Sequence, residues 1–546
     1  MGDSVAHFYL KALEEEAERH PNAVPYSWLL AQFTQIGLDT HSHNFTLHYP
    51  LGNKVFQGVN IYGILRAVRG SSTESLVVST PYRPPTSVHQ KTTASIALML
   101  ALAKFFSEQV YWAKDIIFLI TEHEQLGAQA WLEAYHRSSC GSGVLDSGDL
   151  TARAGPIQAA VNLEIGSSLI SHIDVKIEGL NGQLPNLDLV NLIHRLCHRE
   201  NVHHTFKNYD DHVAPETVKG WMHQLRTLFS MVATQASGVP NGNHGLYHRF
   251  GIASVTVEGV KEHGRTRRSA NLLQVGRVLE GICRSLNNLL ERFHQSFFFY
   301  LLPATNRYIS IGVYMPPFGC LGGSLLTIAL ALWYHTSCAA NEQLKTMKKG
   351  EECETQLVDY SILGQSAIIV LAHALGLTLL FSIEKIPVFS QLFGLLAEDA
   401  LLLSLVAYSV CLLSLPLLVN RATSLSQNSW EILKCLVVLE LSVVVFAGFV
   451  YNFSFGINCD LDICTSRDDH SSFKKFDLEV DVLAKKSISA TKRALMYSVV
   501  DAHVYGNWVF SLGALCLMPI WFILWFIVWH PVNNSKSNSD VKSKTS

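Results

Sequence analysis

The side chains best suited to chemistry stand where a short apolar strand ends. Residues 116–120 form an apolar run, and Glu122, His123 and Glu124 follow almost directly. Carboxylates and an imidazole at the carboxyl end of a strand are what a metal-dependent hydrolase uses to bind its metal and accept a proton. A working metal site and the remnant of one both fit these residue types.

Two more candidates stand at or near other predicted strands. Apolar runs of strand length alternate with helical patterns between residues 59 and 259, which predicts an α/β sheet with helices on both faces. Glu164 ends the strand "AAVNLEIG", and His244 lies in the polar loop before the strand "IASVTVEG". Glu122, Glu164 and His244 would suit zinc, whose catalytic sites usually have three protein ligands. Alternatively, each carboxylate is a helix cap or surface charge, and one of 24 histidines lies nearby by chance.

The composition indicates a membrane protein. Lys and Arg number 42 against 45 Asp and Glu, so no nucleic-acid surface is expected. Charged residues make up only 16% of the chain, against about 25% in soluble proteins. Five apolar runs come near the roughly 20 residues that cross a bilayer. They are residues 313–334, 362–383, 400–419, 432–451 and 508–529.

These runs predict three parts: an α/β domain at residues 1–303, a multi-span helical membrane domain at 304–530 and a polar tail at 531–546. The membrane domain includes a polar insert at 457–497. Basic residues in the loops and tail place the tail in the cytosol and the α/β domain in the lumen. The sequon at Asn44 is a candidate glycosylation site there. The polar start lacks an apolar signal segment, so either the native chain begins further upstream, as we expect, or the predicted orientation is wrong.

Several longer strings carry a family resemblance. The order "LVVSTPYRPP", "TTASIALMLALAKFF", "FLITEHEQLGAQAWL", "AAVNLEIG" and "NGNHGLYHRFGIASVTV" resembles the M28 aminopeptidase fold of zinc exopeptidases. "NIYGILRA", "YWAKDIIFLITEH", "EGLNGQLPNLDL", "ASGVPNGNHGL" and "LLERFHQSFFFYLLP" more closely resemble the GPI-anchor attachment protein 1 family. That family is the M28-like subunit of glycosylphosphatidylinositol (GPI) transamidase. The resemblance covers most of residues 1–456 and resumes over 498–529.

Laying the M28 pattern on this chain implies a degenerate metal site. Positions of metal ligands and the general base fall on Pro81, Arg83, Thr92 and Thr121, which cannot do that work. Glu122, Glu164 and His244 match remaining ligands. A shift of one residue would make Glu124 the base. The expectation is a protein without catalytic residues, metal or cofactor of its own.

The resemblance implies a role in the endoplasmic reticulum membrane. Its partners would be the other transamidase subunits, including a cysteine-protease-like catalytic subunit, together with the GPI lipid and the C-terminal signal of a proprotein. The nucleophile would belong to that catalytic subunit. Two alternatives stay open: a lumenal zinc enzyme, aminopeptidase-like or peptide-bond-forming, that uses the partial site, and a structural membrane adaptor without GPI contact.

The membrane domain has candidates of its own. The family's last helix is implicated in GPI recognition, and Pro519, Trp521 and Trp525 lie in the matching segment. A plain aromatic-rich anchor with a tolerated kink is equally open. Glu440, inside the fourth run, is expected to face a polar partner. The family's N-terminal anchor and further spans have no counterpart here, which a splice form or a shortened gene model would explain.

Overall fold

The computed structural model describes most of the chain and divides it into two compact units. It describes residues 3–348 apart from 22, 53, 69–72, 85, 88, 210–215, 262–268 and 290–297, and then 362–422, 429–452, 454 and 480–529. The first unit comprises Met1–Met315, Phe449–Phe473 and Tyr497–Val509, and the second comprises Pro316–Gly448, Lys474–Met496 and Phe510–Ser546. The predicted tail and residues 457–479 of the polar insert lie outside the described residues. The boundary at residue 303 stays a prediction.

A nine-stranded sheet forms the centre of the first unit, in the order β5-β1-β2-β4-β3-β6-β10-β8-β9. The four middle strands are parallel neighbours. Helices cover both faces, so β3, β4 and β6 are buried along their whole length. The strands are β1 (Asp39–His48), β2 (Val55–Leu65), β3 (Ser75–Pro81), β4 (Asp115–Thr121), β5 (Leu145–Asp146), β6 (Ile157–Ile165), β8 (His172–Lys176), β9 (His204–Thr205) and β10 (Ala253–Val260).

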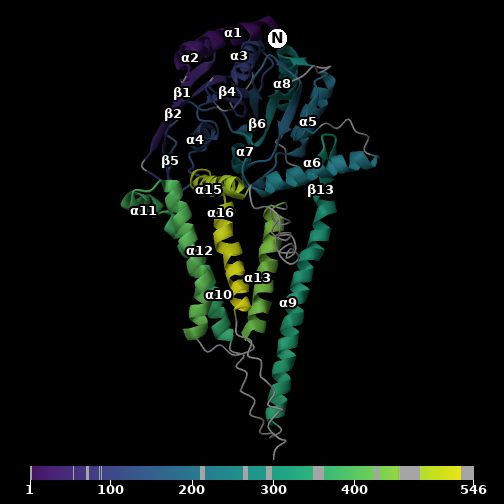
Figure 1. Ribbon diagram of the computed structural model, residues 1–546. Helices are drawn as coiled ribbons and strands as arrows, with labels where there is room; N and C mark the ends of the chain where they lie inside the picture. Colours follow the sequence, from purple (N-terminus) through teal and green to yellow (C-terminus); the bar gives the residue numbers. More distant parts are fainter. Residues whose placement is uncertain are drawn as a thin grey trace, which may run out of the picture. The chain divides into compact units, whose positions relative to one another are not determined.

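Helices pack on both faces of this sheet (Figure 1). The connection through α3 (Thr93–Ser107) leads from β3 to β4, and the one through α4 (Gln125–His136) leads back to β6. Because such crossovers are right-handed, the two helices lie on opposite faces. On the α3 side lie α1 (Asp3–Arg19), α5 (Leu187–Arg199) and α8 (Leu272–Asn287), and α7 (His244–Tyr247) joins α4. The predicted α/β class is confirmed.

The remaining elements of this unit are α2 (Tyr26–Ile36), α6 (Val218–Ala236), the strand pair β7 (Leu169–Ile170) and β11 (Ala270–Asn271), and the hairpin of β12 (Tyr300–Ala304) and β13 (Arg307–Ser310). Helix α8 ends at Asn287. The Lys114 ammonium group donates to the Leu286 and Leu289 carbonyl oxygens at 3.0 and 2.6 Å. This buried cation closes the helix at its negative end.

The other described elements are helices: α9 (Ile311–Lys348), α10 (Ile362–Ile383), α11 (Ile386–Phe393), α12 (Ala397–Ala422), α13 (Ser429–Tyr451), α15 (Val480–Val504), α16 (Val509–Leu512) and α17 (Met518–Val528). Figure 1 shows α10, α12, α13 and the segment from α16 side by side. Among the described residues, four helices are long and apolar enough to cross a membrane: Ile311–Cys338, Gly364–Ile383, Ala397–Leu418 and Val509–Val528. The predicted fifth span, 432–451, is helical in α13, and its membrane crossing stays a prediction.

The core around α4 gives a direct test of the packing. Trp131 is completely buried, with its ring centroid 6.1 Å from that of Tyr62 and 4.9 Å from that of Tyr135. Trp131→Ala is expected to cost about 3 to 5 kcal/mol through lost burial and a cavity. Thermal unfolding of the full chain in detergent measures this, with Trp221→Ala as the matched control at a tryptophan that is 58% exposed. Equal losses of stability in the two variants would contradict the burial of Trp131 in the core.

Candidate functional site

The predicted site residues gather at the carboxyl ends of the middle strands. Thr121 ends β4, Pro81 ends β3, and Glu164 lies one residue before the end of β6. A polar pocket of about 450 Å³ lies at this edge, wholly within the first unit. Its lining includes Arg83, Glu124, Glu164, Lys176, Glu258 and Tyr505. This pocket is the candidate functional site.

A guanidinium group dominates the pocket. Arg83 Nε and Nη2 donate to the two oxygens of Glu124 at 2.5 and 3.0 Å, and Nη2 also donates to Glu164 Oε2 at 3.0 Å. The side chains of Arg83 and Glu164 are only 12% and 5% exposed. Burial opposes the charged form, but the hydrogen bond to Glu124 and the charge of Glu164 raise the pKa of Arg83 above its usual value. A fixed positive charge therefore occupies this part of the pocket.

The turn that presents Glu124 is strained. His123 and Glu124 have φ angles of 58° and 55°, in the left-handed region that side chains other than glycine rarely adopt. Such conformations cost about 1 to 3 kcal/mol each and persist only where surrounding contacts hold them. The two-pronged bond from Arg83 is such a contact. The arginine thus holds the turn at His123 and Glu124 in place.

The other positions that do not match the M28 pattern form ordinary hydrogen bonds. The Thr92 hydroxyl donates to the Pro81 carbonyl oxygen at 2.5 Å and accepts the Arg83 backbone N–H at 3.1 Å. The buried Thr121 hydroxyl accepts from Asn243 Nδ2 at 3.3 Å. These residues hold Arg83 and the loop at Asn243 in place.

The three predicted remnants fall into two networks. Glu122 Oε2 accepts the Tyr26 hydroxyl and the Val59 backbone N–H, both at 2.6 Å. Burial, with the adjacent Glu122, raises the pKa of Tyr26. Glu122 is thus engaged with α2 and β2 and does not line the candidate pocket.

Glu164 and His244 are linked only through intermediates. Asn162 Nδ2 donates to Glu164 Oε1 at 3.1 Å and to the Thr256 hydroxyl at 3.0 Å. That hydroxyl lies 2.7 Å from Nδ1 of His244, a fully buried residue. Burial, with His248 and Lys176 nearby, lowers the pKa of His244 well below its ordinary value.

A metal ion does not fit this arrangement. Arg83 bonds one Glu164 oxygen, Asn162 bonds the other, and Tyr26 holds Glu122. Across the parts of the chain that the structure describes, no three His, Cys, Asp or Glu side chains converge as metal ligands. A guanidinium repels a cation where the M28 pattern would need a ligand.

Two residues of the site, Lys176 and Glu258, were not predicted from the sequence. Glu258 lies directly opposite Glu164 in the register of β10 and β6. Lys176 Nζ lies 3.1 Å from Glu258 Oε1 and 3.7 Å from Glu164 Oε2. The available signal was that "LEIG" and "VEGV" each carry a glutamate near the end of a predicted strand, and two adjacent carboxylates need a cation.

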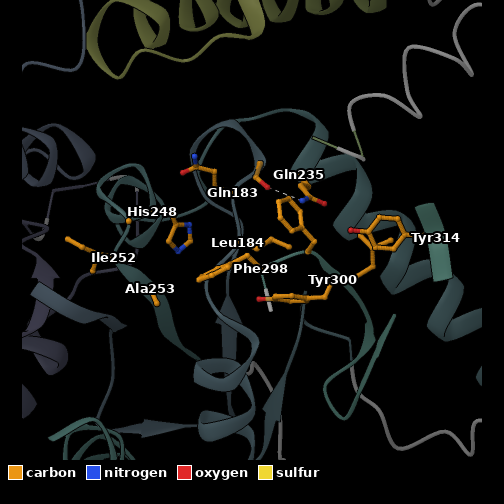
Figure 2. Close-up of a pocket in the computed structure, with 13 residues that line it drawn as sticks. Gln183, Leu184, Gln235, His248, Ile252, Ala253, Phe298, Tyr300 and Tyr314 are labelled. Carbon is orange, nitrogen blue, oxygen red and sulfur yellow. Dashed lines mark hydrogen bonds between the residues drawn. The ribbon is translucent and has the colours of Figure 1, made fainter. Parts of the chain in front are cut away.

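A second cavity in the first unit, of about 500 Å³, is more apolar. Figure 2 shows Leu184, Phe298 and Tyr300 at its centre, with His248 to one side and Tyr314 to the other. Gln235 Nε2 donates to the Gly182 carbonyl oxygen at 2.9 Å at its edge. The carboxylates and cations of the candidate pocket do not line this cavity.

The candidates of the second unit also have defined surroundings. Trp521 and Trp525 stack with centroids 6.2 Å apart and an interplanar angle of 2°. Trp525 Nε1 donates to the Leu413 carbonyl oxygen at 3.3 Å, so this tryptophan also contacts α12. Glu440 Oε1 lies 2.7 Å from His373 Nε2, which supplies the polar contact expected of Glu440. In the first unit, Asn44 is exposed on β1.

Together, these features define a membrane protein whose α/β domain carries an ion-pair network at the edge where related architectures hold their chemistry. The chain belongs to the Gaa1-like, GPI transamidase component, family, whose model matches residues 57–465. It is 33% identical over 304 residues to GPI transamidase component gaa1 of Schizosaccharomyces pombe, covering 55% of this chain and 50% of that protein.

It is also 31% identical over 408 residues to GPI transamidase component GAA1 of Saccharomyces cerevisiae, covering 73% of this chain and 58% of that protein. The chain thus spans between half and three fifths of the length of these relatives. Among solved structures, it is similar to a glutaminyl cyclase of Porphyromonas gingivalis, with 10% identity, 52% of this chain and 98% of that chain covered, and a TM-score of 0.33. It is also similar to a Zn-dependent exopeptidase of Parabacteroides distasonis, with 10% identity, 53% of this chain and 98% of that chain covered, and a TM-score of 0.32.

The ion-pair network predicts a specific stability pattern. Arg83→Met leaves Glu124 without its cation and the buried Glu164 with only the more distant Lys176, and it is expected to cost about 3 kcal/mol. Arg83→Met with Glu164→Gln should recover part of that loss, because the deepest uncompensated charge is gone. Thermal unfolding of the full chain in detergent measures both, with Arg19→Met as the control at an exposed ion pair. A double variant no more stable than Arg83→Met would contradict the network.

The buried histidine of the second cavity predicts a pH dependence. Burial lowers the pKa of His248 from 6.5 to about 4. Between these values the unfolded chain binds more protons, so stability is complete above pH 6.5 and falls as the pH drops toward 4. His248→Gln, which can still donate to the Ser254 carbonyl oxygen, should reduce this loss by up to about 3 kcal/mol.

Unfolding temperatures of the full chain between pH 7 and pH 4.5 measure this dependence. The exposed His20→Gln provides the control for removing a histidine. An acid loss of stability that stays the same in His248→Gln would show that another group causes it.

Proposed function

We propose that this chain is a non-catalytic subunit of GPI transamidase that supports assembly of the complex and recognition of the GPI lipid. The family match and the two relatives, both GPI transamidase components, support this role. The four candidate spans fit a subunit that acts at a membrane. In this proposal the complex joins the ethanolamine of the lipid to the new carboxyl end of a proprotein.

The observation that carries the non-catalytic role is the guanidinium between Glu124 and Glu164. Activating water for peptide hydrolysis needs a metal to lower its pKa and a free carboxylate to take its proton. Here the carboxylates neutralise Arg83 and Lys176 instead. The nucleophile is therefore assigned to a cysteine-protease-like partner subunit, which would form a thioester with the proprotein.

The proposal places the protein in the endoplasmic reticulum membrane, with the α/β domain in the lumen. The exposed position of Asn44 on β1 supports its use as a glycosylation site there. Lipid contact is assigned to the last span, where the exposed ring of Trp521 is stacked on Trp525. Because this span enters the membrane from the lumenal side at Val509, the two rings lie at the depth of the lipid's acyl chains, below its lumenal glycan.

The experiment that tests this role is recovery of the complex. The full chain, tagged at its C-terminus, is expressed and the membranes are solubilised in mild detergent. We expect the cysteine-protease-like subunit and its companions to co-purify, without stoichiometric zinc in the purified material. Recovery of the chain alone, or with one zinc per chain, would overturn the proposal and favour the metalloenzyme alternative.

Glu122 separates the two functions further. A metal-ligand role predicts that Glu122→Ala abolishes activity, whereas a structural role predicts only lost bonds to Tyr26 and Val59. We expect GPI attachment to a reporter to stay within about twofold once corrected for protein abundance, with a stability loss of about 1 to 3 kcal/mol. Tyr26→Phe, which removes one of the same bonds, is the matched control. A more than tenfold loss of attachment at normal abundance would contradict the proposal.

A further inference from the structure

The last candidate span contains a break in its backbone hydrogen bonding. The segment Gly513–Leu517 forms a π-helical turn between α16 and α17, and Pro519 stands two residues after Leu517. Proline has no N–H, so it cannot donate to the Leu515 carbonyl four residues earlier or to the Ala514 carbonyl five residues earlier. In a bilayer, carbonyl oxygens left in this way need another partner.

Helix α10 meets both of these carbonyls. His373 Nδ1 lies 3.1 Å from the Leu515 oxygen. Gly376, three residues further on and therefore on the same face, packs so closely that an added Cβ would lie 2.4 Å from the Ala514 oxygen. A small residue lets the two helix backbones approach, as in other membrane helix pairs. His373 and Gly376 thus lie against the two carbonyl oxygens to which Pro519 cannot donate.

The other side of the imidazole contacts a third helix. Because a carbonyl oxygen only accepts, Nδ1 must carry the hydrogen in this bond. His373 Nε2 faces Glu440 Oε1 on α13 at 2.7 Å. A neutral Nε2 and an ionised carboxylate would repel each other, so one further proton lies between them, and the pair has no net charge. This neutrality suits an apolar surrounding.

We propose that His373 is the positioning residue of the last span: it replaces the hydrogen bond that Pro519 removes, and Glu440 holds its ring in place. The tryptophan face of α17 begins directly after this break, so the bond sets the direction in which Trp521 and Trp525 are presented. Lipid contact through that face rests on the proposed function. The contacts of His373 with the Leu515 carbonyl and with Glu440, hereafter the clamp, do not rest on it.

The first test is a double-mutant cycle on the full chain in detergent, with thermal unfolding as the readout. His373→Ala should lower the unfolding temperature. Pro519→Ala supplies a backbone N–H for the freed carbonyls, so adding His373→Ala to it should have a clearly smaller effect. His373→Asn, whose amide nitrogen can take the place of Nδ1, should behave more like the wild type than His373→Ala does. Equal effects of His373→Ala in the two backgrounds would overturn the clamp.

The second test asks whether the clamp serves lipid contact. Membranes that contain the assembled complex are exposed to a GPI analogue with a photoactivatable diazirine in one acyl chain. Label on the peptide that contains Trp521, normalised to co-purified subunits, should fall about threefold or more in His373→Ala, as expected for loss of one interhelical hydrogen bond. His373→Asn should retain most of the label.

The outcomes separate the two claims. A wild-type chain that assembles with no subunits, or takes up no label, would contradict the proposed function, while the unfolding cycle still decides the clamp. Normal labelling of His373→Ala in an intact complex would show that His373 does not position the lipid-contacting face.

Discussion

A guanidinium held between two carboxylates determines what the carboxyl edge of the sheet can do. Arg83 neutralises Glu124 and the buried Glu164, and it fixes the strained turn at His123 and Glu124. Removing the guanidinium would leave two carboxylates in a poorly solvated place, with only the Lys176 ammonium group 3.7 Å from Glu164. The same bonds occupy the lone pairs that a metal ion would need. The bonds that stabilise this edge are thus the same ones that make it a poor fit for a metal ion.

In the helical unit, a side chain replaces a backbone hydrogen-bond donor. Pro519 removes a backbone donor from an apolar helix, and an imidazole from α10 supplies one. Tyr408 on α12 donates to the Leu375 carbonyl oxygen at 2.6 Å, and Trp525 donates to the Leu413 carbonyl oxygen. Side chains of one helix thus bond backbone carbonyls of the next. In lipid, where helices gain little from hydrophobic burial, such bonds and close backbone contacts are what distinguish one packing from another.

The sequence predicted the middle of the sheet well because buried parallel strands are continuous apolar runs, as in "DIIFLIT" and "ESLVVSTP". It did not predict β1, whose residues are largely polar and half exposed, since pairing with β2 rather than composition makes it a strand. The M28 pattern located Arg83, Glu164 and Thr121 at one edge. It could not show that Glu122 turns to Tyr26, because that depends on where α2 packs. Lys176 and Glu258 escaped because their meeting depends on strand register.

The proposed function gives the ion-pair pocket a structural role and no catalytic one. Replacing a buried ion-pair cluster with apolar residues of similar size is often neutral for stability, so Arg83→Met, Glu124→Leu and Glu164→Leu can be combined in the full chain. The direct measurement is the amount of a GPI-anchored reporter at the surface of cells that depend on this chain, normalised to its abundance. We expect the triple variant to give an amount of anchored reporter close to that of the wild type. Loss of anchoring, with the chain abundant and its partner subunits still bound, would contradict it.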